Sequence, residues 1–160
     1  MSISRVDVGM PPENFEGWVA ANVCFHGFAN LSATTRGEYV ESPVFSCFGH
    51  QWVLKLYPGG RDNSDEGYVA IGIVNRSNTS IKIQYCYSVR DANCREVVHR
   101  SYTNKEFCAL GSSTNAWSKS NFALRLELLE SLVDGALVIE VRMKSTTTTG
   151  KSITQFIPTP

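Results

Sequence analysis

Two cysteine–histidine pairs are the first residues of this sequence whose types and spacing could support chemistry. Cys24 and His26 lie two positions apart and Cys47 and His50 lie three apart, so together they could offer four ligands to a tetrahedral zinc ion. Structural zinc sites usually present a tighter knuckle of two cysteines or two histidines, and neither pair has that form. We therefore predict no metal site and no cofactor, and we interpret these four side chains as ordinary strand or loop residues.

Two further segments imitate ligand-binding loops. Residues 62–67 begin like a calcium loop, but Ile73 stands where a bidentate glutamate belongs, and a strand-like run follows in place of a helix. Residues 150–152 match the end of a phosphate-binding loop, but Ser145 occupies the position of its first glycine. Neither segment is predicted to bind the corresponding ligand.

Nucleophilic catalysis has candidate residues but no recognisable arrangement. The chain contains five cysteines and three histidines, yet it has no G-x-S-x-G elbow and no family signature around any cysteine. A triad assembled only in space leaves no sequence pattern, so a hydrolase with a cysteine nucleophile stays open as an alternative. Our prediction is that the protein is not an enzyme.

The elements that must position these residues are strands. Short apolar runs recur between turn residues, at the spacing typical of a β-sandwich or barrel. In the first clear run Trp52, Leu54 and Leu56 share one face, so that face is predicted to enter a core. The run at 68–74 is apolar on both faces, whereas the run at 81–89 alternates and is predicted to be half exposed. A last alternating run, at 137–143, is predicted to pair centrally with earlier strands.

One short helix is expected between these strands. Leu124, Leu128 and Leu129 recur at helical spacing before the Asp134-Gly135 turn, and Asn121 is a candidate N-cap.

The remaining segments are expected to be loosely held. We predict an N-terminal lead-in at residues 1–21, a single β domain at 22–144 and a threonine-rich tail or linker at 145–160.

Composition narrows the classes of partner. Fifteen basic and fifteen acidic residues cancel, so no strong field attracts nucleic acid or an anionic membrane surface. No run approaches the roughly 20 apolar residues of a membrane span, and the N-terminus lacks the apolar core of a signal peptide. The five cysteines are odd in number and scattered, as is typical of reduced thiols. We expect a cytoplasmic or nuclear protein that binds neither nucleic acid nor membrane.

Three motifs in residues 41–60 carry a resemblance to a known family. They read S-P-x-F, G-x-x-W and Y-P-G-G, and they occur in that order. Further matches follow at residues 67–71, at 85–89, at Trp117 with Phe122, and at 134–141. Over about residues 22–144 the chain resembles a MATH domain, also called a TRAF-like domain, and its pattern is most similar to the MATH domains of MATH-BTB adaptors.

The resemblance implies both a fold and a function. The fold is an all-β antiparallel sandwich of seven to eight strands, with one short helix in this chain. The implied function is binding of a short linear peptide segment of a protein partner, by backbone pairing and side-chain pockets along a shallow groove. Family members commonly join the domain to ubiquitin-ligase or other signalling components, so a role in substrate recognition or as a scaffold is expected.

The resemblance also implies a set of peptide-binding residues. In the speckle-type POZ proteins, aromatic residues and a W-G-F turn line the groove. Here Tyr85 matches one aromatic and Trp117 the tryptophan, while Gly72 replaces another aromatic and Ser118-Lys119 replace Gly-Phe. The implied site comprises Gly72, Val74, Tyr85, Asn115, Trp117, Ser118 and Lys119.

Three of these assignments have alternatives, and so does the function. Trp117 could be a structural aromatic instead of a groove residue. Tyr85 shares its parity with Ile83 and Tyr87, so it could instead be a core residue. Lys119 would favour an acidic or phosphorylated peptide, unless it is an ordinary surface lysine. The main functional alternative is a structural domain whose sheet edges pair with another copy, since an oligomer is compatible with these patterns.

Overall fold

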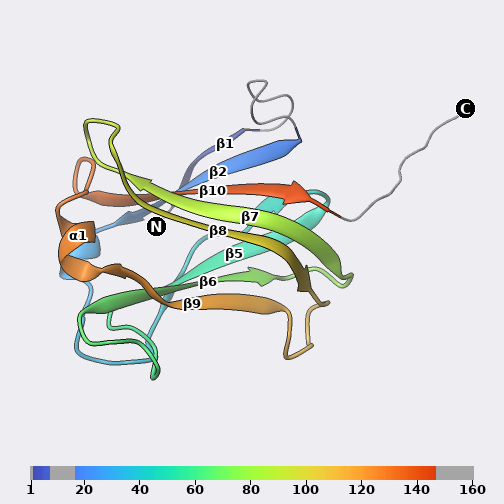
Figure 1. Cartoon of the computed structure of the whole chain (residues 1–160), viewed down its shortest axis with the longest axis horizontal. Coiled ribbons are helices and arrows are strands. Elements are labelled where there is room, and N and C mark those ends of the chain that lie inside the picture. Colours follow the sequence, from blue (N-terminus) through green and yellow to red (C-terminus); the bar gives the residue numbers. More distant parts are fainter. Residues whose placement is uncertain (1, 8–16, 147–160) are drawn as a thin grey trace, which may run out of the picture.

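The structure, a computed structural model, describes residues 2–7 and 17–146. Within them the chain forms two stacked antiparallel sheets, as Figure 1 shows, and one short α-helix, α1 (Arg125–Leu129). Sheet A has the strand order β1 (Ser2–Asp7), β2 (Trp18–His26), β10 (Ala136–Ser145), β7 (Ile81–Arg90) and β8 (Glu96–Phe107). Sheet B has the order β3 (Val40–Glu41), β5 (His50–Tyr57), β6 (Tyr68–Asn75) and β9 (Ala116–Leu124), and β4 (Phe45–Cys47) also pairs with β5. A 3-10 helix, η2 (Phe28–Asn30), follows β2.

The predicted β-sandwich is therefore confirmed, with more strands than expected. Ten strands are described where seven to eight were predicted. The difference comes from β1, which lies in the expected lead-in, and from β3 and β4, which have only two and three residues. Strands this short leave no periodic pattern in a sequence.

The core lies between the two sheets and is built from the predicted alternation. Trp52, Leu54 and Leu56 are completely buried. The Trp52 ring meets Phe107 edge-on with centroids 5.1 Å apart, and its Nε1 donates to the Cys47 carbonyl at 3.1 Å. An aromatic on β5 thus links sheet B to the last residue of β8 in sheet A, while its one polar atom is satisfied.

Predictions for three other strands have mixed outcomes. β6 is buried along almost its whole length, and β10 pairs centrally between β2 and β7, both as expected. The prediction that β7 is half exposed is wrong in part, because Cys86 and Ser88 on its outer side are only 8% and 4% exposed. They are flanked by longer side chains, since Cys86 pairs with Arg142 and Ser88 Oγ lies 3.2 Å from His99 Nδ1.

The helix forms where it was expected, but its N-terminus differs. Asn121 does not cap it; Asn121 lies in β9, where its Nδ2 donates to Asp65 Oδ2. The helix begins after Leu124, whose backbone N–H reaches Glu127 Oε1 at 3.4 Å. A strand therefore continues through the residue that the sequence offered as a cap.

The expected lead-in contains strands. β1 pairs with β2 in antiparallel register, and β2 itself starts at Trp18. The prediction of a loosely held segment over 1–21 differs from the structure because β2, which pairs with both β1 and β10, begins inside it. At the other end β10 reaches Ser145, and the rest of the predicted tail from 147 on lies outside the described residues. No helix in the described part is long and apolar enough to cross a membrane.

Candidate functional site

β8 and β9 are the outer strands of their respective sheets and lie on the same side of the sandwich (Figure 1). They follow one another in the chain, and the Cys108 N–H donates to the Thr114 carbonyl where the connecting loop closes. Beyond that loop, Trp117 Nε1 donates to the Glu106 carbonyl at 2.8 Å and bridges the two strands. Two sheet edges are thus brought together along one flank.

The β9 edge has backbone groups that β6 does not use. Asn75 donates to the Asn115 carbonyl at 2.8 Å, and the register continues with Ile73 opposite Trp117 and Gly72 opposite Ser118. Because hydrogen-bonded pairs alternate along an antiparallel ladder, Trp117 directs its N–H and C=O toward β6, whereas Ser118 directs its own away from β6. The backbone of Ser118 is therefore available to an added strand.

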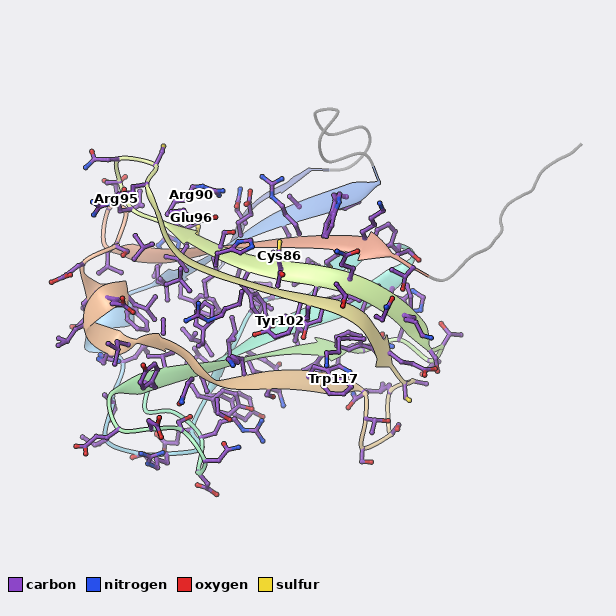
Figure 2. The ribbon with its side chains drawn as sticks, viewed as in Figure 1. Cys86, Arg90, Arg95, Glu96, Tyr102 and Trp117 are labelled. Carbon is purple, nitrogen blue, oxygen red and sulfur yellow. The ribbon has the colours of Figure 1, made fainter. Side chains whose placement is uncertain are left out.

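Trp117 lies on the core-facing side of β9, since it pairs with the buried Ile73. The residue is 38% exposed, and Lys105 Nζ on β8 sits 4.3 Å from the ring centroid. Figure 2 shows Trp117 and Tyr102 in the region between the β8 and β9 ribbons. The indole therefore has a structural role in linking the two sheet edges, and part of its apolar surface is still accessible to a ligand.

Gly72 leaves space for the Ser118 side chain and contributes no side chain to a binding groove. It is buried in β6, and a Cβ added there would lie 3.0 Å from Ser118 Oγ. An aromatic side chain at this position would have to displace Ser118. The small residue and the serine opposite it therefore replace the aromatic surface that the family resemblance implied.

Two predicted site residues are buried. Tyr85 is 3% exposed and packs against Tyr87, Tyr102 and Phe107, so its alternative interpretation as a core aromatic is correct. Val74 is 5% exposed and cannot contact a bound segment directly. Tyr85 belongs to the core between the two sheets, whereas Val74 follows the core-facing Ile73 and lies on the other face of sheet B, opposite Val53.

Asn115 has a supporting position at the start of β9. Its Nδ2 donates to the Asn75 carbonyl at 3.2 Å, and it is half-buried. The exposed members of the predicted set are thus the consecutive residues Trp117, Ser118 and Lys119, with Asn115 holding the strand end in place.

β8 contributes three residues that sequence reasoning missed. Tyr102, Arg100 and Lys105 pair with the core residues Tyr85, Tyr87 and Ile83, so their side chains leave β8 on the side that faces β9. We call the set of Arg100, Tyr102 and Lys105 with Trp117, Ser118 and Lys119 the edge site. A register shift between Ile83 and Tyr85 hides the alternation of β8, which is why period-two counting did not find these residues.

The edge site carries positive charge without acidic partners. Among the described residues no carboxylate forms an ion pair with Arg100, Lys105 or Lys119. Burial raises the pKa of the Tyr102 hydroxyl, and the nearby charge of Arg100 offsets part of that rise. The hydroxyls of Tyr102 and Tyr87 are both buried without a hydrogen-bond partner in the described part of the chain.

The zinc arrangement raised by the sequence does not assemble. Both ring nitrogens of His50 are engaged, Nδ1 at 2.9 Å from the Phe48 carbonyl and Nε2 at 3.0 Å from Thr79 Oγ1. No group of three or more potential metal ligands occurs within the described residues.

The catalytic alternative has one superficial candidate on the outer face of sheet A. Ser88 Oγ and Glu96 Oε2 both approach the same nitrogen, His99 Nδ1, at 3.2 and 3.5 Å. A catalytic triad needs the nucleophile and the acid on opposite ring nitrogens, so this grouping cannot relay a proton. Burial raises the pKa of Cys47 to about 12 and also raises that of Cys86, which disfavours the thiolate that a nucleophile requires.

The open, partly aromatic edge of this antiparallel β-sandwich and its match to an interaction-domain family together identify a protein-interaction module. The family model described as "MATH domain" matches residues 25–143, and the chain belongs to this family. Among solved structures, Notothenia coriiceps TRAF5 matches with a TM-score of 0.59 and 13% sequence identity, over 87% of this chain and 77% of that chain. At that identity the likeness concerns the fold. A search of curated protein sequences found no match.

Proposed function

We propose that this domain binds an extended segment of a partner protein, which adds to the β9 edge beside Ser118. The observation that carries the proposal is the outward-facing Ser118 backbone, in a strand that has a neighbour on one side only. Such an edge supplies main-chain donors and acceptors to any extended chain, and flanking side chains supply the selectivity. Trp117 and Lys119 are the flanking side chains on β9.

The affinity is expected to be modest. A segment of this kind contacts few side chains, and ordering it costs several kcal/mol, so a single site should bind in about the micromolar range. Tighter capture would come from several segments or several domains acting together.

The cellular role that we propose is substrate recognition or scaffolding in ubiquitin-linked signalling. Membership of the MATH family supports this part of the proposal. It is tested by asking whether partners recovered through the β9 edge include ubiquitin-ligase components, and whether their recovery is lost together with peptide binding.

A proline substitution tests the edge directly. Proline at position 118 removes an N–H that β6 does not use, so the Ser118→Pro variant should fold while losing the donor offered to a ligand. The probe is an unbiased array of 12-residue peptides, followed by fluorescence polarisation on the peptides that bind the wild-type domain. We expect Ser118→Pro to weaken their binding by at least about tenfold.

The matched control is Ser118→Ala, which keeps the backbone N–H and should bind within about twofold of wild type. Circular dichroism and thermal denaturation show whether both variants fold. Peptides bound equally well by folded Ser118→Pro, or no peptide bound by the wild type, would contradict the proposal.

Self-assembly is the second candidate function, and the same free edge favours it. β9 of one copy could pair with an edge of another, since unpaired strands are templates for association. Light scattering at several concentrations separates the two: a stable oligomer that Ser118→Pro dissociates would favour assembly over peptide capture.

A further inference from the structure

We propose that the edge site selects segments that carry anionic oxygens, either acidic side chains or phosphorylated ones. This inference rests on the proposed function, because it names the chemistry of the segment that β9 would bind. The first observation is the charge of the site. Arg100 and Lys105 lie on β8 and Lys119 on β9, the outer strands of the two sheets on one flank. Arg100 Nη1 donates to the His99 carbonyl, and none of the three has a carboxylate partner among the described residues.

Basic residues elsewhere in the described chain are satisfied in two ways: some form ion pairs with carboxylates, and others, such as Arg36 and Arg125, donate to backbone carbonyls. Of the other positions with basic residues, Arg76 pairs with Glu41, Arg90 with Glu140 and Arg95 with Asp91. A chain with equal numbers of acidic and basic residues could have neutralised the edge site in the same way. Because it has not, an incoming anion would be the first opposite charge that these side chains meet.

The nearest acidic residues along the two strands point elsewhere. Glu106 pairs with Lys82, which places its side chain on the side of β8 away from Lys105. Asp65 lies beyond the far end of the exposed part of β9. Its carboxylate accepts from Asn121 Nδ2, and its backbone N–H donates to Asn121 Oδ1. Neither carboxylate therefore neutralises the edge site.

A second observation concerns a donor that lacks an acceptor. The Tyr102 hydroxyl is buried, has no partner in the described part of the chain, and lies close enough to Arg100 for the charge to affect its pKa. A buried donor without an acceptor is unfavourable, but this hydroxyl is closed off from solvent, so an incoming oxygen would reach it only after the Tyr102 side chain moved. The charges of Arg100, Lys105 and Lys119 therefore carry the inference, and the Tyr102 hydroxyl would be only an additional donor.

The spacing of the basic residues sets the length of the segment. Arg100 and Lys105 lie five positions apart on β8, which spans about 15 Å along a strand. Lys119 lies two residues beyond Trp117 on β9, and Lys105 stacks on the Trp117 ring. A matching segment would carry one anionic group near Trp117 and a second about four or five residues away.

The experiment uses the whole chain and four matched peptide sets built on one extended scaffold. The sets are neutral, glutamate-bearing, phosphoserine-bearing and lysine-bearing, with the charged residues at two positions of variable separation. We expect both anionic sets to bind about tenfold or more tightly than the neutral set, and the preference to shrink at 0.5 M salt. The comparison of the two anionic sets identifies which oxygen source is preferred.

Charge-reversal variants locate the effect. Lys119→Glu and Arg100→Glu should each weaken binding of anionic peptides by about three- to tenfold, with little effect on neutral peptides. The matched control is Lys144→Glu, which makes the same charge change at an exposed position at the end of β10 in sheet A. It should leave binding within about twofold.

The outcomes separate this inference from the proposed function. If neutral peptides bind as well as anionic ones, and Ser118→Pro still abolishes capture, the inference is wrong while the proposed function stands. If anionic peptides bind but respond equally to Lys144→Glu and Lys119→Glu, the edge site is not the selective element. If no set binds, the proposed function fails and the inference fails with it.

Discussion

The outer face of sheet A and the edge site use the same basic residue types in opposite ways. On the outer face Glu140 accepts from Arg90 at 3.0 Å and from Arg142 at 3.0 Å, and Arg90 also reaches Glu96 at 3.5 Å. Figure 2 shows Arg90 and Glu96 close together near the β7–β8 turn and well away from Trp117. In the edge site the basic side chains have no such partners among the described residues.

The difference indicates which charged residues stabilise the fold. The Arg90–Glu140–Arg142 ladder joins β7 to β10, so it is satisfied inside the molecule and has little left to offer a ligand. The basic residues of the edge site stabilise no strand pairing through an ion pair, and they lie beside a strand whose backbone is half unpaired. Paired charges join strands on the outer face of sheet A, and the unpaired charges beside the open edge are the ones that we propose meet a bound segment.

The largest expected effect comes from breaking the paired face. Glu140 is only 16% exposed and accepts from two arginines, so Glu140→Ala leaves both guanidinium groups without their common acceptor. We expect the free energy of unfolding to fall by about 1–2 kcal/mol, discounted because Arg90 is partly exposed. Chemical denaturation measures this change. If the free energy of unfolding falls no more than for a substitution at an exposed position, the paired charges do not stabilise the fold and the distinction between the two regions is wrong.

Acid pH should reproduce part of the same effect. Burial alone would raise the pKa of Glu140, but hydrogen bonds and charges from Arg142 and Arg90 outweigh burial and lower it. The carboxylate therefore contributes stability that is complete above the ordinary glutamate pKa of about 4.3 and is lost as pH falls through the lower folded value. Denaturation curves from pH 7 to pH 2 should fall less steeply in this window for Glu140→Gln than for the wild type. Parallel curves would show that Glu140 is not linked to stability.

The smallest expected effect on stability comes from the edge site. Lys119 is exposed and has no acidic partner among the described residues, so Lys119→Glu should change the free energy of unfolding by less than about 0.5 kcal/mol. The same denaturation assay measures it beside Glu140→Ala. A loss as large as that of Glu140→Ala would mean that Lys119 serves the fold after all.

Much of the fold could be predicted because it depends on local alternation and on separated motifs. Trp52, Leu54 and Leu56 enter the core as their period indicates, and β10 takes its central place. The short strands β3 and β4 and the strand β1 could not be predicted, because their pairing depends on neighbours that are distant in sequence.

The positions of the candidate site residues could be predicted only in part, for a similar reason. Trp117, Ser118 and Lys119 come from one motif on one strand, and the structure places them together on the β9 edge. Tyr85 was ambiguous, since parity alone does not say which face of a strand is buried, and the packing of Tyr87 and Phe107 decides it. Arg100 and Lys105 required the register of β8 against β7, including its irregularity, before their direction became evident.

Amide hydrogen exchange at Ser118 tests the central claim most directly, with and without an anionic peptide that binds. The Trp117 amide, directed toward β6, should exchange slowly in both states, whereas the Ser118 amide should exchange rapidly in the free domain and become protected when the peptide binds. A Ser118 amide that is already protected in the free domain, or that exchanges at the same rate with peptide bound, would contradict the account.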